Sequence, residues 1–234
     1  TINDDEATPT IYFTVATSSA AESVGTHDIT VELSGASASP VSWTITRAGS
    51  ATEGGGNDYT DTGLSYTMSA GDVIQTITVT VNDDNVGEPD ETVIYDIASV
   101  SGGGVTEGSV STHTFTIDVN DTPAVEFASA TSTVAEDVAG LTHDIILTLS
   151  NPADANVTFT YSDAGTGSAA TPADYTSPTG TRTFAAGETF HTVTMGLVND
   201  SLYEGTEDVD FTISGVSGDG TVGRNIHPEH LDLI

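Results

Sequence analysis

Five carboxylates lie close together in the stretch NDDNVGEPDE, residues 82–91. They are Asp83, Asp84, Glu88, Asp90 and Glu91, and the runs on either side, TITVTV and TVIYDI, are typical of strands. Carboxylates this close repel one another unless solvent, protons or cations neutralise them. The stretch therefore indicates a solvated acidic loop, a catalytic acid pair or a cation site.

Composition favours cations as partners. The chain of 234 residues has 35 acidic residues against 3 basic ones, a formal net charge of -32, and no Cys. Proteins bind nucleic acid and anionic membranes through Lys and Arg, so we expect neither as a partner. No run approaches the ~18 to 20 apolar residues of a membrane helix, and we expect no membrane insertion.

A repeat with an interval of 116 residues organises the chain. His27-Asp28 recurs as His143-Asp144, and Glu22 recurs as Glu136 two residues earlier than this interval because AEDVAGLTHD is longer than AESVGTHD. Further pairs that keep the interval are Asp58-Tyr59 and Asp174-Tyr175, Gly71-Asp72 and Gly187-Glu188, Asp84 and Asp200, Glu88 and Glu204, and Glu91 and Glu207.

These pairs predict two copies, residues 9–122 and 123–234, which we call copy 1 and copy 2. The boundary lies near Thr122-Pro123, and a short linker with Pro should be stiff. The opening TINDDE indicates that residues 1–8 are the end of an earlier repeat or a linker. We therefore expect the chain to be a piece of a longer protein.

Apolar residues alternate with polar ones within each copy, as in half-buried strands. Ile29, Val31 and Leu33 show this pattern in copy 1, and strands are also expected near 11–15 (Ile11, Phe13, Val15), 64–68 and 115–119. The other residues expected to face a core are Val41, Trp43, Ile45, Ile77, Val79, Val81, Val93, Tyr95 and Ile97, and in copy 2 Ile145, Leu147, Leu149, Val157, Phe159, Tyr161, Val193, Met195, Leu197, Val209, Phe211 and Ile213. The predicted fold class is all-β, with two tandem antiparallel immunoglobulin-like sandwiches of about seven strands each.

Alternating strand directions would gather the acids of copy 1 at one pole. Every second connection between such strands lies at the same end. Glu22 lies in the first of these connections, Asp58 in the second and the stretch 82–91 in the third, while Asn120-Asp121 follows the last strand. Such a cluster repels itself unless cations occupy it. Ca²⁺ takes about 6 to 8 oxygen ligands and accepts irregular loops, so the cluster predicts a calcium site, with room for two ions or more.

The same residues resemble the Calx-beta domain family, found in sodium/calcium exchangers and in tandem arrays of large extracellular and bacterial surface proteins. The resemblance covers both copies almost end to end. It is carried by a Glu before a Gly and a strand, the Asp-Tyr pair after a Gly-rich loop, a Gly-acid turn, the DD...E..E loop and the Asp-rich end of copy 1.

This resemblance implies calcium ligands at the matching positions, with the Val86 carbonyl contributing. They are Glu22, Asp58, Asp83, Asp84, Glu88, Glu91, Asn120 and Asp121 in copy 1, and Glu136, Asp174, Asn199, Asp200, Glu204 and Glu207 in copy 2. Copy 2 departs from the pattern twice: Asn199 replaces an expected Asp, and no terminal Asp pair comes before the closing HLDLI. We expect its site to be poorer.

Two other interpretations are disfavoured by spacing. The stretch from Asp83 lacks the 12-residue pattern of an EF-hand and lies between strands rather than helices. His27 and Asp28 are neighbours on an expected strand, so they point to opposite faces and cannot act together as a catalytic base and its carboxylate.

Two further interpretations lack the neighbouring groups that such sites require. Glu88 and Glu91 have no apolar pocket of the kind that raises the pKa of a glycosidase acid. His227 and His230, in HPEH, offer only two ligands for a transition metal. We expect no enzyme.

The expected function is a calcium-binding structural and adhesive module that stiffens a longer extracellular protein. Its expected partners are calcium ions, neighbouring repeats and a cell-surface protein or glycan. A calcium sensor is one alternative. A carbohydrate-binding sandwich is the other, but it needs an aromatic platform, and Trp43, the only Trp, alternates with Val41 and Ile45 on the presumed core face.

Overall fold

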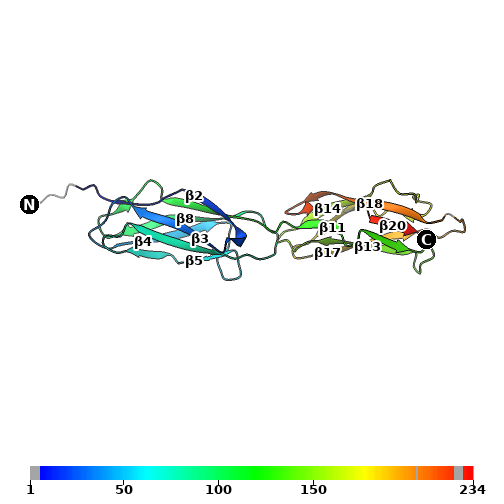
Figure 1. Ribbon diagram of the computed structural model, residues 1–234, viewed down its shortest axis with the longest axis horizontal. Coiled ribbons are helices and arrows are strands. Elements are labelled where there is room, and N and C mark those ends of the chain that lie inside the picture. Colours follow the sequence, from blue (N-terminus) through cyan, green and yellow to red (C-terminus); the bar gives the residue numbers. More distant parts are fainter. Residues whose placement is uncertain (1–5, 204, 224–228, 234) are drawn as a thin grey trace, which may run out of the picture. The chain divides into compact units, whose positions relative to one another are not determined.

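The computed structural model describes residues 6–203, 205–223 and 229–233. It confirms the predicted all-β fold class, because the regular elements of these residues are strands and a single short 3₁₀ turn, η1 (Glu22–Val24). The described residues form ten strands in each copy rather than the expected seven or so. The chain divides into two compact units, one containing β1 to β10 and the other β11 to β20 (Figure 1). The expectations for Glu204 and His227 fall outside the described residues. Within those residues, no helix has the length and apolar character needed to cross a membrane.

Two five-stranded sheets enclose the core of copy 1. Their strand orders are β5-β7-β3-β1-β9 and β2-β10-β8-β4-β6. The strands are β1 (Thr10–Phe13), β2 (Thr17–Ala21), β3 (Thr26–Leu33), β4 (Val41–Gly49), β5 (Tyr59–Asp61), β6 (Ser65–Met68), β7 (Ile74–Val81), β8 (Glu91–Ser101), β9 (Thr106–Glu107) and β10 (Thr112–Asp118).

The strand expected near 11–15 ends at Phe13 as β1, and the chain then crosses to the other sheet, where it forms β2. β1 pairs antiparallel with β3, whereas β2 pairs parallel with β10, from Thr17 opposite Thr114 to Ala21 opposite Asp118. The change of sheet interrupts the alternation, so Val15, which we expected on the core face, is 52% exposed. Because β2 and β10 run in the same direction, the residues that follow them leave the sandwich at the same end.

Copy 2 repeats this plan. Its sheets have the orders β15-β17-β13-β11-β19 and β12-β20-β18-β14-β16. The strands are β11 (Ala124–Phe127), β12 (Thr131–Val134), β13 (Thr142–Leu149), β14 (Val157–Asp163), β15 (Tyr175–Thr176), β16 (Gly180–Phe184), β17 (Phe190–Leu197), β18 (Glu207–Ser217), β19 (Thr221–Val222) and β20 (Glu229–Leu233).

The alternating residues of the central strands form the cores. Apart from Val15 and Val119, which is half-buried, every residue that we expected by name to face a core is at most 6% exposed. Trp43 is 1% exposed and stacks on Tyr66 with 4.7 Å between ring centroids. It packs in the core and offers no aromatic platform to a sugar.

A chain of hydrogen bonds joins two histidines through Ser18 on β2. His113 Nδ1 lies 2.8 Å from the carbonyl oxygen of Val15, which only accepts, so this nitrogen carries the proton. In the neutral ring Nε2 then accepts from Ser18 Oγ at 2.8 Å, and Ser18 Oγ accepts from His27 Nε2 at 2.9 Å. A proton on His113 Nε2 would break this order, because Ser18 would face two donors.

We expect stability to fall as pH decreases from 8 to 5. Burial lowers the pKa of His113, opposed by its hydrogen bond to Val15 and aided by His27, and burial also lowers the pKa of His143. The unfolded chain takes up these protons near pH 6.5 (about the free His value), while the folded chain resists them. Urea unfolding at fixed millimolar calcium should show the decrease, and His113→Gln should show a smaller one. Equal pH dependence in the two chains would contradict this role of His113.

Candidate metal centre

Glu22 is buried at a turn between two strands. β2 ends at Ala21, η1 follows at once, and Gly25 at φ 78° leads the chain into β3. This backbone conformation favours Gly, which has no Cβ to be strained. The Gly25 carbonyl accepts a hydrogen bond from Val81 N at 2.9 Å, which ties the turn to the end of β7. Glu22, 7% exposed, is thereby held close to the acidic stretch that follows β7.

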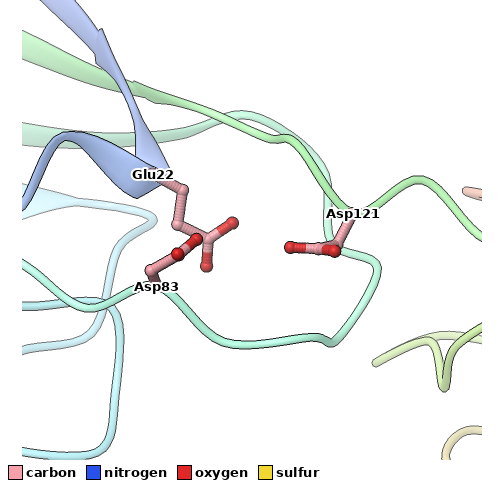
Figure 2. Close-up of side chains that lie close together, drawn as sticks. All are labelled: Glu22, Asp83 and Asp121. Carbon is pink, nitrogen blue, oxygen red and sulfur yellow. The ribbon is translucent and has the colours of Figure 1, made fainter.

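Glu22, Asp83 and Asp121 form a first group of carboxylates. One oxygen from each lies within 4.8 Å of the other two. Figure 2 shows Glu22 and Asp83 side by side, with Asp121 directed toward them from across a common space. The amide of Asn120 donates to Asp83 Oδ1 at 3.1 Å. Oxygens bound to one Ca²⁺ at about 2.3 to 2.6 Å lie at most about 5 Å apart, so the spacing fits a shared ion.

A second group consists of Asp58, Glu88 and Glu91. Their carboxylate oxygens also lie within 4.8 Å of one another, and all three residues are partly buried. Asp58 precedes β5, and its carbonyl accepts a hydrogen bond from Asn82 N at 2.9 Å. Glu91 is the first residue of β8. The hydrogen bond from Asn82 thus ties the loop of Asp58 to the beginning of the stretch that contains Glu88.

Both groups offer a divalent cation several oxygen donors and a local negative charge. Their donors are oxygens only, which is the ligand type of Ca²⁺ rather than of zinc or copper. Three carboxylates within 4.8 Å repel one another strongly when ionised, and a cation removes that repulsion. The donor set therefore fits calcium: Glu22, Asp83 and Asp121 would hold one ion, and Asp58, Glu88 and Glu91 would hold another.

Asp84 and Val86 lie in the same stretch between β7 and β8. Asp84 is exposed and Val86 is half-buried. Within the described residues, the two carboxylate groups do not include Asp84. Asp90, which the sequence interpretation left out of the ligand set, accepts a hydrogen bond from Val119 N at 2.9 Å. It ties the acidic stretch to the chain just beyond β10.

The corresponding residues of copy 2 form local hydrogen bonds. Asp200 N donates to Glu136 Oε1 at 3.2 Å, so these two predicted ligands lie together. Asp174 is 9% exposed, and its Oδ2 accepts from Ala170 N at 2.6 Å. Asn199 is exposed, and Glu207 begins β18. In the described part of the chain, both groups of three carboxylates use acids that we assigned to copy 1.

The neighbouring His27 and Asp28 contact different strands. His27 reaches Ser18 on β2, whereas Asp28 Oδ1 accepts from Thr78 on β7 at 2.7 Å. His143 and Asp144 have equivalent contacts with Ser132 and Thr194. As expected from strand geometry, the two side chains of each pair do not form a catalytic unit.

Sequence reasoning missed Arg47 on β4, which forms ion pairs with Glu53 and Asp61. Tyr95 Oη donates to Asp61 Oδ2 at 2.9 Å. Burial, followed by the charge of Asp61, raises the pKa of Tyr95 well above its usual range, so its hydroxyl remains a donor. A signal was present in the composition, because Arg47 is one of only 3 basic residues.

The Calx-beta domain model matches residues 4–117 and, a second time, residues 118–229. This chain belongs to the Calx-beta domain family. The family and its tandem arrangement, which the sequence motifs indicated, are thus confirmed. Calx-beta domains are binding domains of a non-catalytic type.

Solved structures of Calx domains are among those similar to this chain. CBD12 from CALX1.2 is 20% identical over 90% of this chain and 83% of that one, with a TM-score of 0.39. The apo-form Calx CBD1 domain is 21% identical over 49% of this chain and 100% of that one, with a TM-score of 0.42. A putative carbohydrate binding protein from Bacteroides ovatus is 11% identical over 87% of this chain and 67% of that one, with a TM-score of 0.39. No curated protein matches the Calx-beta chain.

Proposed function

We propose that this Calx-beta pair is a calcium-binding structural and adhesive module of a longer extracellular protein. One observation carries the proposal: six carboxylates from separate segments of copy 1 gather into two groups whose oxygens lie within 4.8 Å. A solvated acidic loop would not need acids from so many segments. The residues proposed to hold the ions are Glu22, Asp58, Asp83, Glu88, Glu91 and Asp121, with Asn120 supporting Asp83.

Calcium suits these groups better than magnesium does. Mg²⁺ requires near-octahedral geometry and keeps several waters, whereas Ca²⁺ accepts many protein oxygens in irregular loops. As an extracellular module, the chain should bind calcium with a dissociation constant nearer ~10⁻⁴ to 10⁻³ M than the ~10⁻⁷ to 10⁻⁵ M of sensors. The net charge of -32 and the absence of Lys also favour a salty exterior. Neighbouring repeats and a cell-surface protein or glycan are the proposed partners.

Bound calcium would stiffen the chain through the residues that enter the linker. Asn120 and Asp121 directly precede Thr122-Pro123 in the sequence. A metal held by Asp121, Glu22 and Asp83 restrains the backbone just before this linker. Without metal the same acids repel one another and release it. The ion thus limits the angles at which copy 2 leaves copy 1.

Small-angle scattering of the whole chain tests the stiffening. We expect the spread of maximum dimensions to be broad in chelator and narrow in millimolar calcium, with calorimetry confirming that calcium is bound. The double variant Glu22→Gln, Asp83→Asn should keep the broad distribution in calcium. Scattering that stays the same although calcium binds would mean that the ions stabilise single domains only.

A further inference from the structure

The two ion pairs of the described residues share one arginine. Arg47, on β4, contacts Glu53 through one terminal nitrogen and Asp61 through the other. Its side chain is 15% exposed, and that of Asp61 is 0% exposed. A carboxylate without contact with solvent needs a cation or several donors close by. Asp61 has both, because Tyr95 Oη donates to it at 2.9 Å and Gly63 N at 2.8 Å.

These two carboxylates stand on opposite arms of one loop. Glu53 lies on the arm that leaves β4, and Asp61 ends β5, by which the chain returns. The arms are joined by a hydrogen bond from Gly54 N to the Tyr59 carbonyl at 2.8 Å. Asp58 lies between Glu53 and Asp61 in the sequence. Arg47 therefore forms ion pairs with the loop on both sides of Asp58, a proposed calcium ligand.

Hydrogen bonds within the same loop also restrain the Asp58 carboxylate. Asp58 N donates to the Thr52 carbonyl at 3.2 Å, and Thr52 N donates back to Asp58 Oδ2. This reciprocal pair fixes both the backbone and the side chain of Asp58. The other carboxylates of its group belong to Glu88, which lies between β7 and β8, and to Glu91, the first residue of β8. Loop 51–61 must hold its shape for Asp58 to meet them.

We infer that Arg47 is a positioning residue for the calcium site, holding loop 51–61 so that Asp58 is in place before the metal arrives. The inference rests on the proposed calcium binding. Arg47 suits the task because its planar guanidinium forms two directed contacts at once, which a Lys ammonium does not. The repulsion among Asp58, Glu88 and Glu91 would otherwise favour an open loop in the metal-free chain.

Copy 2 has no equivalent of Arg47 and its two acidic partners. At the interval of 116 residues, Asp163 stands in the place of Arg47, Ala169 in that of Glu53, Ser177 in that of Asp61 and Phe211 in that of Tyr95. Asp163 accepts a hydrogen bond from Tyr175, and the buried Ser177 hydroxyl has no hydrogen-bond partner among the described residues. Among the residues that the structure describes, the two ion pairs of Arg47 therefore occur in the copy that supplies both carboxylate groups.

The sign of the effect separates positioning from simple electrostatics. A positive charge near the site repels Ca²⁺, so removing it would raise calcium affinity if charge alone mattered. If Arg47 positions Asp58, its removal lowers affinity instead. Changes in residues that orient metal ligands typically lower metal affinity by about 10- to 100-fold. We expect a loss of about 10-fold at one site of copy 1 in Arg47→Met.

Two measurements on the full chain test this inference. Calorimetry gives the calcium affinity of the wild type, Arg47→Met and Arg47→Lys, and Arg182→Met in copy 2 is the control with the same change of charge. Amide hydrogen exchange in chelator reports the loop without metal. We expect faster exchange at Asp58 and Gly54 in Arg47→Met, a smaller effect in Arg47→Lys and none in the control.

The outcomes are distinct. A wild type that binds no calcium removes the proposed function, whatever the exchange data show. Calcium binding in the wild type with equal or tighter binding in Arg47→Met, or with unchanged exchange in the loop, overturns the positioning role. If Arg47→Met fails to fold, judged by Trp43 fluorescence, Arg47→Lys decides: weaker binding supports the inference, and wild-type affinity overturns it.

Discussion

Calcium at about 10 mM, 100 times a dissociation constant of ~10⁻⁴ M, is expected to raise the melting temperature of copy 1 by on the order of 10 °C relative to chelator. A ligand at 100 times its dissociation constant adds about 2.7 kcal/mol to stability for one site, and each kcal/mol shifts the midpoint of a domain of this size by roughly 4 °C. The effect arises because calcium binds the folded acids, whereas the unfolded chain does not hold Glu22, Asp83 and Asp121 together. Calorimetric melting in excess chelator and in calcium measures it directly.

Two variants make this prediction specific. The double variant Glu22→Gln, Asp83→Asn should lose the part of the calcium response that the first group contributes and keep the part that comes from Asp58, Glu88 and Glu91. Glu107→Gln, which removes an exposed charge on β9, should keep the wild-type response. Superimposable wild-type curves in the two conditions would remove the basis for the calcium proposal.

Replacement of Trp43 by Ala is expected to cost about 3 to 5 kcal/mol, enough to unfold a marginal domain. Trp43 is 1% exposed and stacks on Tyr66, so the truncation leaves a cavity that its neighbours cannot fill. Urea unfolding followed by circular dichroism gives the loss. Phe190→Ala is the control, because Phe190 is 69% exposed and should lose at most about 0.5 kcal/mol.

The comparison also tests the architecture of copy 1. Equal losses in Trp43→Ala and Phe190→Ala would contradict a core position for Trp43 and would reopen its use as a platform for a sugar. A large loss confined to Trp43→Ala supports the sandwich in which β4 packs its alternate residues inward.

Most of the fold was predictable because the period of two is a local property. Each of the central strands alternates in the sequence as it does in the structure, so Ile29, Trp43 and Val79 were assigned to the core correctly. The crossing of the chain from β1 to β2 was not predictable in this way. Val15 continues the alternation in the sequence, but it lies between β1, which pairs with β3, and β2, which pairs with β10, and strand pairing is a non-local choice.

The sequence predicted that the acids of the candidate site gather at one end of copy 1, but it did not predict how they divide into groups. Counting strands placed the connections of Glu22, Asp58 and Asp83 at one end, and the structure brings these acids into two groups. Which acids share a group depends on loop conformation, which a count of strands does not specify. Arg47 was missed for a related reason: its partners Glu53 and Asp61 lie in a loop whose closure depends on backbone hydrogen bonds such as that from Gly54 to Tyr59.

The parallel pairing of β2 with β10 bears on how copy 1 responds to tension. One strand lies near the N-terminal side of copy 1 and the other is its last strand, and Thr17 to Ala21 align with Thr114 to Asp118 in the same direction. Force applied through the two ends of this domain pulls parallel partners in opposite directions along their length. All hydrogen bonds of the pair are then loaded in shear together, instead of opening one after another as in peeling. Such a domain resists extension along the direction in which β2 and β10 run.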